Sequence, residues 1–186
     1  TSNDIILYAT GKWRKAATPF SEILVEQDCR LYEAHLSILG WLNSAGLDKK
    51  IVLKANNTEE LNEIPYSFKN VLVEFNTSFS SLLSRANIII LDTPATTLIE
   101  ACATKCPIFV LGGRAVYKKD FLTAVKKRVV WCETINNLIK NLELYFADGI
   151  YNSDIYDMSF FDLYCGQSTE EETIQNVTRG LKRIIL

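Results

Sequence analysis

Short aliphatic runs recur along the chain, and longer stretches of mixed polarity separate them. Most of the runs are continuously hydrophobic rather than alternating, which is typical of parallel strands that are buried on both faces. They predict strands at approximately 5–8, 51–53, 71–73, 88–91, 108–111 and 129–131.

The stretches between the predicted strands have the length and composition of helices. They predict helices at approximately 28–45, 78–85, 95–104, 117–126, 134–147 and 169–185. The last of these opens with a capping box, because Ser168 or Thr169 stands three residues before a glutamate, Glu171 or Glu172. Residues 148–168 are aromatic and irregular, and we expect a packed connection there rather than a second domain.

The alternation of strands and helices predicts an α/β fold, a doubly wound parallel sheet of Rossmann-like type with helices on both faces. We expect one domain over residues 1–186. In the usual strand order 3-2-1-4-5-6, the first and fourth strands are neighbours, and such sheets bind ligands in the crevice outside the carboxyl ends of that pair. The loops after Tyr8 and Leu91 are therefore the first candidates for a site.

Composition and charge narrow the class of protein. The 186 residues include 48% hydrophobic and 23% charged residues, which is typical of a globular domain. A net charge of −2 argues against nucleic-acid binding through a basic surface. No apolar run approaches the roughly 18 residues of a membrane span, and no signal-peptide pattern opens the chain, so we expect a cytoplasmic domain without a transmembrane segment. The chain begins at Thr1, and Met158 is its one methionine, so we expect it to be excised from a longer protein.

The cysteines and the histidine do not form a metal-binding pattern. The five cysteines are an odd set without CxxC spacing, so neither a disulfide scaffold nor a zinc site is expected, and we predict no metal. The one histidine, His35, lies within a predicted helix and has no obvious partner in the sequence. We interpret it as a structural residue.

The loop after the fourth predicted strand favours an anion site. Thr93 is a candidate N-cap with Pro94 at the first helical position, which would leave the next amides free to face the crevice. Such amides, with the positive end of the helix dipole, suit a phosphate group. Thr96, Thr97 and Glu100 share the side of this helix that would face a ligand. A capped helix with a solvated polar stripe explains the same residues, so both interpretations stand at this point.

The loop after the first predicted strand is basic. Gly11 permits a tight turn close to a ligand, and Lys12, Arg14 and Lys15 would place positive charge beside the same crevice. The chain has neither the GxxxxGK[ST] pattern of P-loop proteins nor the GxGxxG pattern of dinucleotide-binding domains.

Residues 71–111 contain a recognisable series of features. These are a helix at 82–86, a strand that ends in Asp92, a Ser/Thr-rich turn at 93–97, Glu100-Ala101 on the next helix and Pro107 before the following strand. In this series the segment resembles the C-terminal half of GT-B-fold glycosyltransferases. The opening sequence IILYATGKWRK and the ending FFDLYCGQSTEEETIQNVTRGLKRII are similar to segments of the CDP-glycerol glycerophosphotransferase group, which makes surface polymers.

This resemblance implies a donor-binding domain for a nucleotide-sugar, with no separate cofactor. Thr96 and Thr97 would bind the donor phosphates, Glu100 would hold the ribose, and Gly11 with Lys12 or Arg14 would face the diphosphate. The base would lie near Phe75 and Asn76. The acceptor site and the catalytic residues, which remain unknown, would belong to a missing N-terminal domain, so the chain would be inactive alone.

The chain departs from this family at one motif, and two other functions are compatible with the same sequence. The polymer-forming group carries Lys-x-His-Pro after its second strand, whereas this chain has Lys54-Ala55-Asn56-Asn57, which argues against glycerophosphate transfer by that mechanism. A domain like that of UDP-sugar 2-epimerases is one alternative, since those enzymes share the two-domain architecture. A non-catalytic, Rossmann-like interaction domain is the other.

Overall fold

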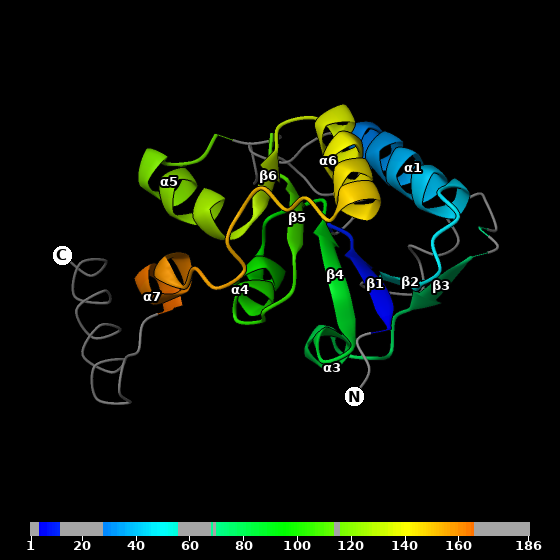
Figure 1. The fold of residues 1–186 in the computed structure, drawn as a ribbon, viewed down its shortest axis with the longest axis horizontal. Coiled ribbons are helices and arrows are strands. Elements are labelled where there is room, and N and C mark those ends of the chain that lie inside the picture. Colours follow the sequence, from blue (N-terminus) through cyan, green and yellow to red (C-terminus); the bar gives the residue numbers. More distant parts are fainter. Residues whose placement is uncertain (1–3, 12–27, 56–67, 69, 114–115, 166–186) are drawn as a thin grey trace, which may run out of the picture.

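The protein folds around one parallel β-sheet. The computed structural model describes residues 4–11, 28–55, 68, 70–113 and 116–165. The strands are β1 (Ile5–Ala9), β2 (Lys50–Lys54), β3 (Val71–Glu74), β4 (Ala86–Leu91), β5 (Ile108–Leu111) and β6 (Val130–Cys132). Their order is β3-β2-β1-β4-β5-β6, and every neighbouring pair is parallel (Figure 1). The predicted strands, their order and the α/β Rossmann-like class are confirmed.

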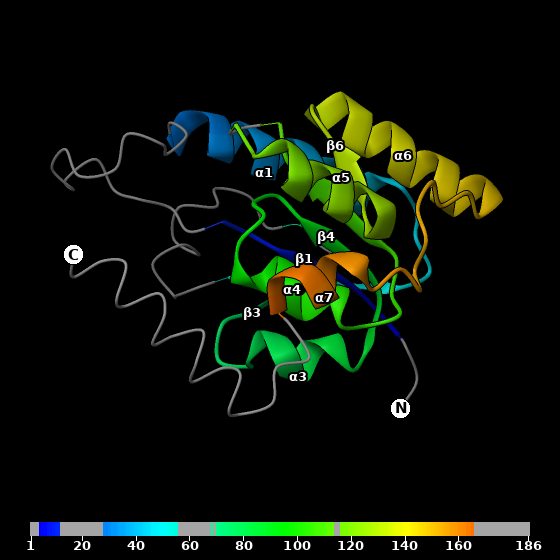
Figure 2. The same cartoon turned by 90° about the vertical axis from the view of Figure 1, so that its left-hand side faces the viewer.

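Helices cover both faces of the sheet. They are α1 (Asp28–Ser44), α3 (Phe79–Leu83), α4 (Thr96–Cys102), α5 (Lys119–Arg128), α6 (Ile135–Asp148) and α7 (Ser159–Cys165). In Figure 2, α1 and α6 lie above the strands, and α3, α4 and α7 lie below them. The helix expected at 169–185 lies outside the described residues.

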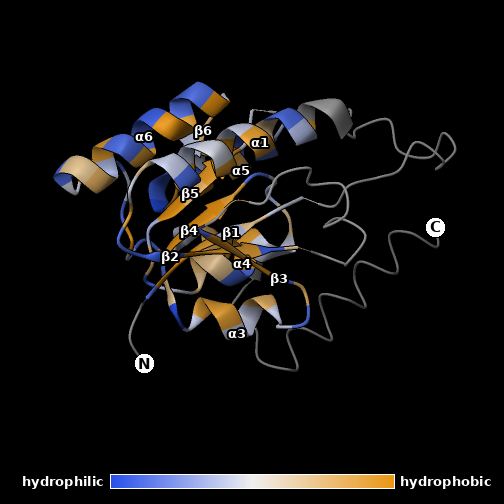
Figure 3. Cartoon of the chain, turned by 90° about the vertical axis from the view of Figure 1, so that its right-hand side faces the viewer, coloured by the Kyte–Doolittle hydropathy of each residue, from blue (hydrophilic) through white to orange (hydrophobic). Residues whose placement is uncertain are grey.

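Two hydrophobic cores form, one on each face, because successive side chains of a strand point to opposite sides. In β1, Ile5 and Leu7 join the core beneath α3, α4 and α5, whereas Ile6 and Tyr8 join the core beneath α1 and α6. All four side chains are fully buried, which explains why the strand is continuously hydrophobic in sequence. Figure 3 shows this layering, with mostly hydrophobic strands between helices that carry both hydrophobic and hydrophilic residues.

The aromatic segment after α6 is packed, as expected, but it is not irregular throughout. It contains α7, whose Phe160 is 1% exposed and joins the core, with its ring centroid 5.4 Å from that of Phe121. The Tyr151 hydroxyl donates a hydrogen bond to the carbonyl of Arg128 (2.7 Å) and accepts one from the amide of Ile108 (3.1 Å). The sequence pattern missed α7 because the helix is short and buries few of its side chains.

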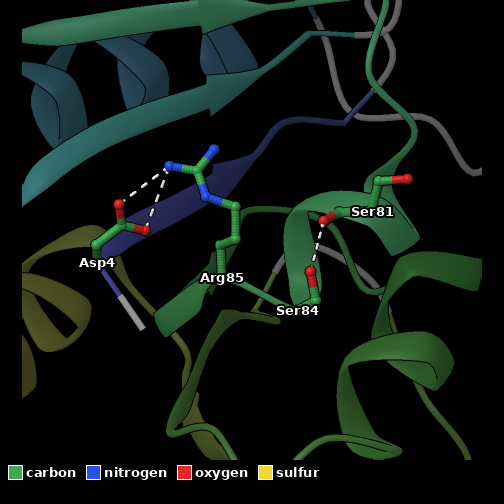
Figure 4. A network of polar contacts seen from close by, with 4 residues as sticks. All are labelled: Asp4, Ser81, Ser84 and Arg85. Atoms are coloured by element: carbon green, nitrogen blue, oxygen red, sulfur yellow. Dashed lines mark hydrogen bonds and ion pairs between the residues drawn. The ribbon is translucent and has the colours of Figure 1, made fainter. Parts of the chain in front are cut away.

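Contacts between Asp4 and Arg85 join the starts of β1 and β4, the central pair of strands. There Asp4 forms an ion pair with Arg85 (3.1 Å), and its amide bonds to the Arg85 carbonyl (3.0 Å; Figure 4). Both side chains are 45% exposed, and an ion pair this accessible to water contributes little to stability. The ion pair thus joins the starts of β1 and β4, whereas the fully buried carboxylate of Asp92 lies at the opposite, carboxyl ends of these two strands.

Candidate functional site at the carboxyl ends of β1 and β4

The carboxyl ends of β1 and β4 lie side by side at the centre of the sheet. Ala9 is paired in register with Leu91, so the residues that follow each strand emerge next to one another. This is the position at which the strand order reverses, where open α/β sheets bind ligands. The fold therefore places the two predicted loops at one crevice.

Asp92 is the centre of a buried polar cluster at this position. Its side chain is fully buried, and both of its oxygens are engaged. Oδ1 accepts a hydrogen bond from the Gly11 amide (2.5 Å), and Oδ2 accepts one from the Tyr8 hydroxyl (2.9 Å). Oδ2 also contacts Nε2 of His35, which is itself 1% exposed. Asp92, His35, Tyr8 and Gly11 thus connect β4, α1, β1 and the loop after β1.

The environment of Asp92 favours the charged carboxylate. Burial by itself would raise the pKa of this carboxyl, because a charge is poorly solvated in the interior. The opposing effects of the His35 charge and of hydrogen bonds from His35, Gly11 and Tyr8 outweigh burial and hold the pKa of Asp92 below its ordinary value. A negative charge is therefore held in the interior, directly beneath the residues that follow β1 and β4.

Gly11 is required here by close packing. A Cβ atom at this position would collide with the side chain of Thr93, so the turn after β1 approaches β4 closely only with glycine. The amide of Gly11 is bonded to Asp92 and is directed at β4. The contact between Gly11 and a diphosphate remains a prediction. Because the amide of Gly11 is bonded to Asp92, other groups would have to bind the diphosphate there. Lys12 and Arg14 lie outside the described residues.

The helix after β4 begins later than predicted. Ala95 is its N-cap and provides no side-chain hydrogen bond, and α4 begins at Thr96, so the assignments of Thr93 to the N-cap and Pro94 to the first helical position are wrong. The physical reason is that the Thr93 side chain is packed against the position of Gly11. The helix is anchored through Leu98, Ala101 and Cys102, which are buried.

The predicted ligand-facing residues of α4 are accessible. Thr96 and Glu100 are exposed, and Thr97 is partly buried. They lie at the start of α4 and one turn into it, on the helix that follows Asp92 directly. Their roles toward phosphate and ribose remain predictions.

A lysine holds the loop that was predicted to approach the base. Nζ of Lys54, at the end of β2, donates hydrogen bonds to the carbonyls of Ala55 (2.8 Å) and Phe75 (2.9 Å). The side chain of Phe75 is partly buried and that of Asn76 is exposed. Lys54 therefore fixes the start of the loop after β3, while contact of Phe75 or Asn76 with a base remains a prediction.

The sequence interpretation missed the contacts of His35 and Tyr8. The structure gives His35 a partner that was not obvious in the sequence, the carboxylate of Asp92. A signal was present in the pattern, because the positions of α1 that lie three or four residues from His35, namely Leu31, Ile38 and Leu39, are hydrophobic and buried. A histidine on such a face needs a buried polar partner.

The described residues provide neither a metal-binding cluster nor a membrane-spanning helix. No group of three His, Cys, Asp or Glu side chains in this part of the chain could hold a metal ion. The side chains of Cys102, Cys106 and Cys132 are buried. No helix within the described ranges is long and apolar enough to cross a membrane.

Comparison with known proteins gives matches at the level of structure. The sequence matches no family model and no curated protein. The structure of the glycosyltransferase VinC in complex with DTDP is similar with a TM-score of 0.54 and 14% identity, over 97% of this chain and 42% of VinC. UDP-GlcNAc 2-epimerase from Methanocaldococcus jannaschii is similar with a TM-score of 0.56 and 15% identity, over 96% of this chain and 46% of the epimerase. The wall teichoic acid polymerase TagF is similar with a TM-score of 0.53 and 18% identity, over 100% of this chain and 46% of that one.

These similarities show the fold. The chain has the α/β Rossmann-like domain found in GT-B glycosyltransferases and in a UDP-GlcNAc 2-epimerase. It spans less than half the length of each of these three proteins. At these identities the activity does not follow from the fold.

Proposed function

We propose that this chain is the donor-binding half of a glycosyltransferase and that it binds a nucleoside diphosphate sugar in the crevice at the carboxyl ends of β1 and β4. The single observation that carries the proposal is the convergence of the Gly11 turn, Asp92 and the start of α4 at the central strand pair of a GT-B-like domain. VinC, whose structure contains DTDP, has a domain of this fold.

In this proposal the accessible residues of α4 bind the donor. Thr96 and Thr97 hold the phosphates, Glu100 accepts hydrogen bonds from the ribose hydroxyls, and Lys12 and Arg14 supply positive charge from the loop after Gly11. The base lies toward Phe75 and Asn76, whose loop Lys54 holds in place. The contribution to catalysis is electrostatic, since backbone dipoles and basic side chains stabilise the leaving diphosphate as the glycosidic bond breaks.

Within this proposal, the glycosyltransferase takes part in the biosynthesis of surface carbohydrate and acts in the cytoplasm. The similarity of the opening and closing segments to the CDP-glycerol glycerophosphotransferase group supports it, and the wall teichoic acid polymerase TagF has a domain of this fold. An N-terminal acceptor domain would supply the acceptor site and the catalytic residues, and the chain by itself would bind donor without transferring it. No metal and no further cofactor take part in this scheme.

The test is a calorimetric titration with UDP, CDP, GDP, dTDP and CMP. Saturable binding of one diphosphate is expected, and its affinity should be nearly unchanged when Mg²⁺ is added. Thr97→Ala and Glu100→Gln should each weaken that binding about tenfold, which corresponds to the loss of one hydrogen bond to a charged group. Thr123→Ala on α5 and Glu33→Gln on α1 are matched controls, because both residues are exposed and lie on other helices. No binding of any nucleotide would contradict the proposal and favour a non-catalytic interaction domain.

A second candidate is a UDP-sugar 2-epimerase-like domain. It is favoured by the similarity to UDP-GlcNAc 2-epimerase, whose TM-score is 0.56. Both functions use the same donor crevice, so binding alone does not separate them. Product analysis with the full-length protein does, since an epimerase converts UDP-GlcNAc without any acceptor and a transferase releases nucleotide only with one.

A further inference from the structure

The cluster beneath the crevice contains a carboxylate whose charge needs compensation. Asp92 is fully buried, and its Oδ1 holds the amide of Gly11, so the negative charge lies directly below the loop after β1. A buried carboxylate without a positive partner is strongly disfavoured. The same charge would also repel a diphosphate bound above it.

His35 is placed to supply the compensating charge. Its Nε2 contacts Oδ2 of Asp92, and the imidazole is 1% exposed, so water screens the pair little. The Tyr8 hydroxyl donates to the same oxygen (2.9 Å), and the tyrosine and histidine rings pack edge to face with centroids 5.9 Å apart. Tyr8 adds a hydrogen bond but no charge, so only His35 among these contacts changes the net charge of the cluster.

We propose that His35 is the buried counter-ion that allows the crevice at the carboxyl ends of β1 and β4 to accept an anionic ligand. With His35 as an imidazolium, the pair with Asp92 is neutral overall. With a neutral imidazole, Nε2 still donates a hydrogen to Asp92, but a net negative charge remains beneath the ligand. His35 therefore acts as a positioning and specificity-determining residue through Asp92, and does not touch the ligand itself. This inference rests on the proposed function, in which that ligand is a nucleoside diphosphate.

If His35 compensates the charge of Asp92, a second substitution that removes this charge should restore the affinity that is lost with His35. A merely structural role of His35 does not predict this recovery. His35→Gln leaves the Asp92 charge uncompensated, and should weaken diphosphate binding about tenfold, as expected for one unit charge at close range. Asp92→Asn removes the charge, keeps an oxygen that can accept from the Gly11 amide, and should bind within about threefold of the original protein. The double variant carries neither charge, so it should recover the affinity that His35→Gln loses. Tyr8→Phe removes a hydrogen bond from the same carboxylate without a change of charge, and should affect affinity less than His35→Gln.

The experiment titrates each variant by calorimetry with UDP and with uridine, alongside CDP and cytidine, GDP and guanosine, and dTDP and thymidine. The expected result is that His35→Gln weakens binding of the diphosphate but not of its neutral nucleoside, and that the double variant restores it. If the original protein binds a diphosphate and His35→Gln binds it equally well, the counter-ion inference is overturned and the proposed function stands. If the original protein binds none of them, the proposed function itself fails.

A second measurement needs no variant and covers the case in which His35→Gln does not fold. Because the chain has one histidine, every imidazole signal in a ¹⁵N spectrum belongs to His35. In the complex with the bound diphosphate at pH 7, both ring nitrogens should carry the chemical shifts of protonated nitrogen. A non-protonated ring nitrogen in that complex would overturn the inference.

Discussion

The amide of Gly11 donates a 2.5 Å hydrogen bond to the carboxylate of Asp92, which joins the loop after β1 to the end of β4. A charge-assisted bond of this length constrains the turn strongly. The carboxylate of Asp92 is fully buried, and it can be so because the Gly11 amide, the Tyr8 hydroxyl and the His35 imidazole together contact its two oxygens. The shape of the candidate site therefore depends on the buried side chains of Asp92, Tyr8 and His35.

Gly11→Ala should destabilise the protein by about 1–3 kcal/mol, because the new methyl group would collide with Thr93 and force the turn away from β4. Urea unfolding measures the change. Gly40→Ala is the matched control, since a Cβ at that helical position meets nothing within 4 Å and alanine should stabilise α1 by up to about 1 kcal/mol. Equal effects of the two substitutions would contradict the packing described at Gly11.

Asp92 should contribute to stability in a pH-dependent way. Its pKa in the folded protein lies below the ordinary value of 3.8, so the unfolded chain takes up a proton at this residue before the folded protein does. The stabilisation is therefore present above about pH 4 and is lost as the pH falls through the lower, folded value. Urea unfolding between pH 7 and pH 3 should show a smaller loss of stability for Asp92→Asn than for the original protein. Asp4→Asn, at the exposed edge of the sheet, should follow the original protein more closely.

Cys132 should be chemically inert in the folded protein. Burial, with a smaller effect from the charge of Glu133, raises the pKa of its thiol from 9.0 to about 12, so the reactive thiolate is scarce at pH 8.5. Alkylation with iodoacetamide at that pH, followed by peptide mass spectrometry, should leave Cys132 unmodified in the native protein and label it in 8 M urea. Rapid labelling of the native protein would show that this end of β6 is open to solvent.

Tyr151→Phe should destabilise the protein by about 1–3 kcal/mol, because it leaves the amide of Ile108 and the carbonyl of Arg128 without the hydroxyl that both now contact. Thermal unfolding measures the loss. Tyr156→Phe is a suitable control, as that side chain is 65% exposed and its change should be small. A loss of equal size at both positions would mean that the hydroxyl of Tyr151 does not join these segments.

The sequence predicted the sheet well because its signals are local. Most strands contain a short continuous hydrophobic run such as Ile88-Ile89-Ile90-Leu91, which is typical of a parallel strand buried on both faces. The strand order then followed from the usual arrangement of a doubly wound sheet. The central strand pair, and with it the position of the crevice, could therefore be predicted from the sequence alone.

The details of the crevice were not predictable in the same way. Thr93 is a good N-cap by local rules, but its side chain packs against a loop far away in the sequence, and the helix begins at Thr96 instead. The contact between His35 and Asp92 likewise depends on how α1 crosses the sheet, which hydrophobic spacing does not specify. Local patterns determine the elements, whereas these contacts depend on their packing.

The most direct test of the central claim is a ¹H–¹⁵N correlation spectrum recorded during titration with UDP, CDP, GDP and dTDP. Binding of one of them should shift the amides of Gly11, Thr93, Thr96 and Thr97, at the carboxyl ends of β1 and β4, and should leave Arg85, at the opposite edge, unchanged. Shifts confined to the opposite edge, or no shifts at millimolar nucleotide, would contradict a donor site in this crevice.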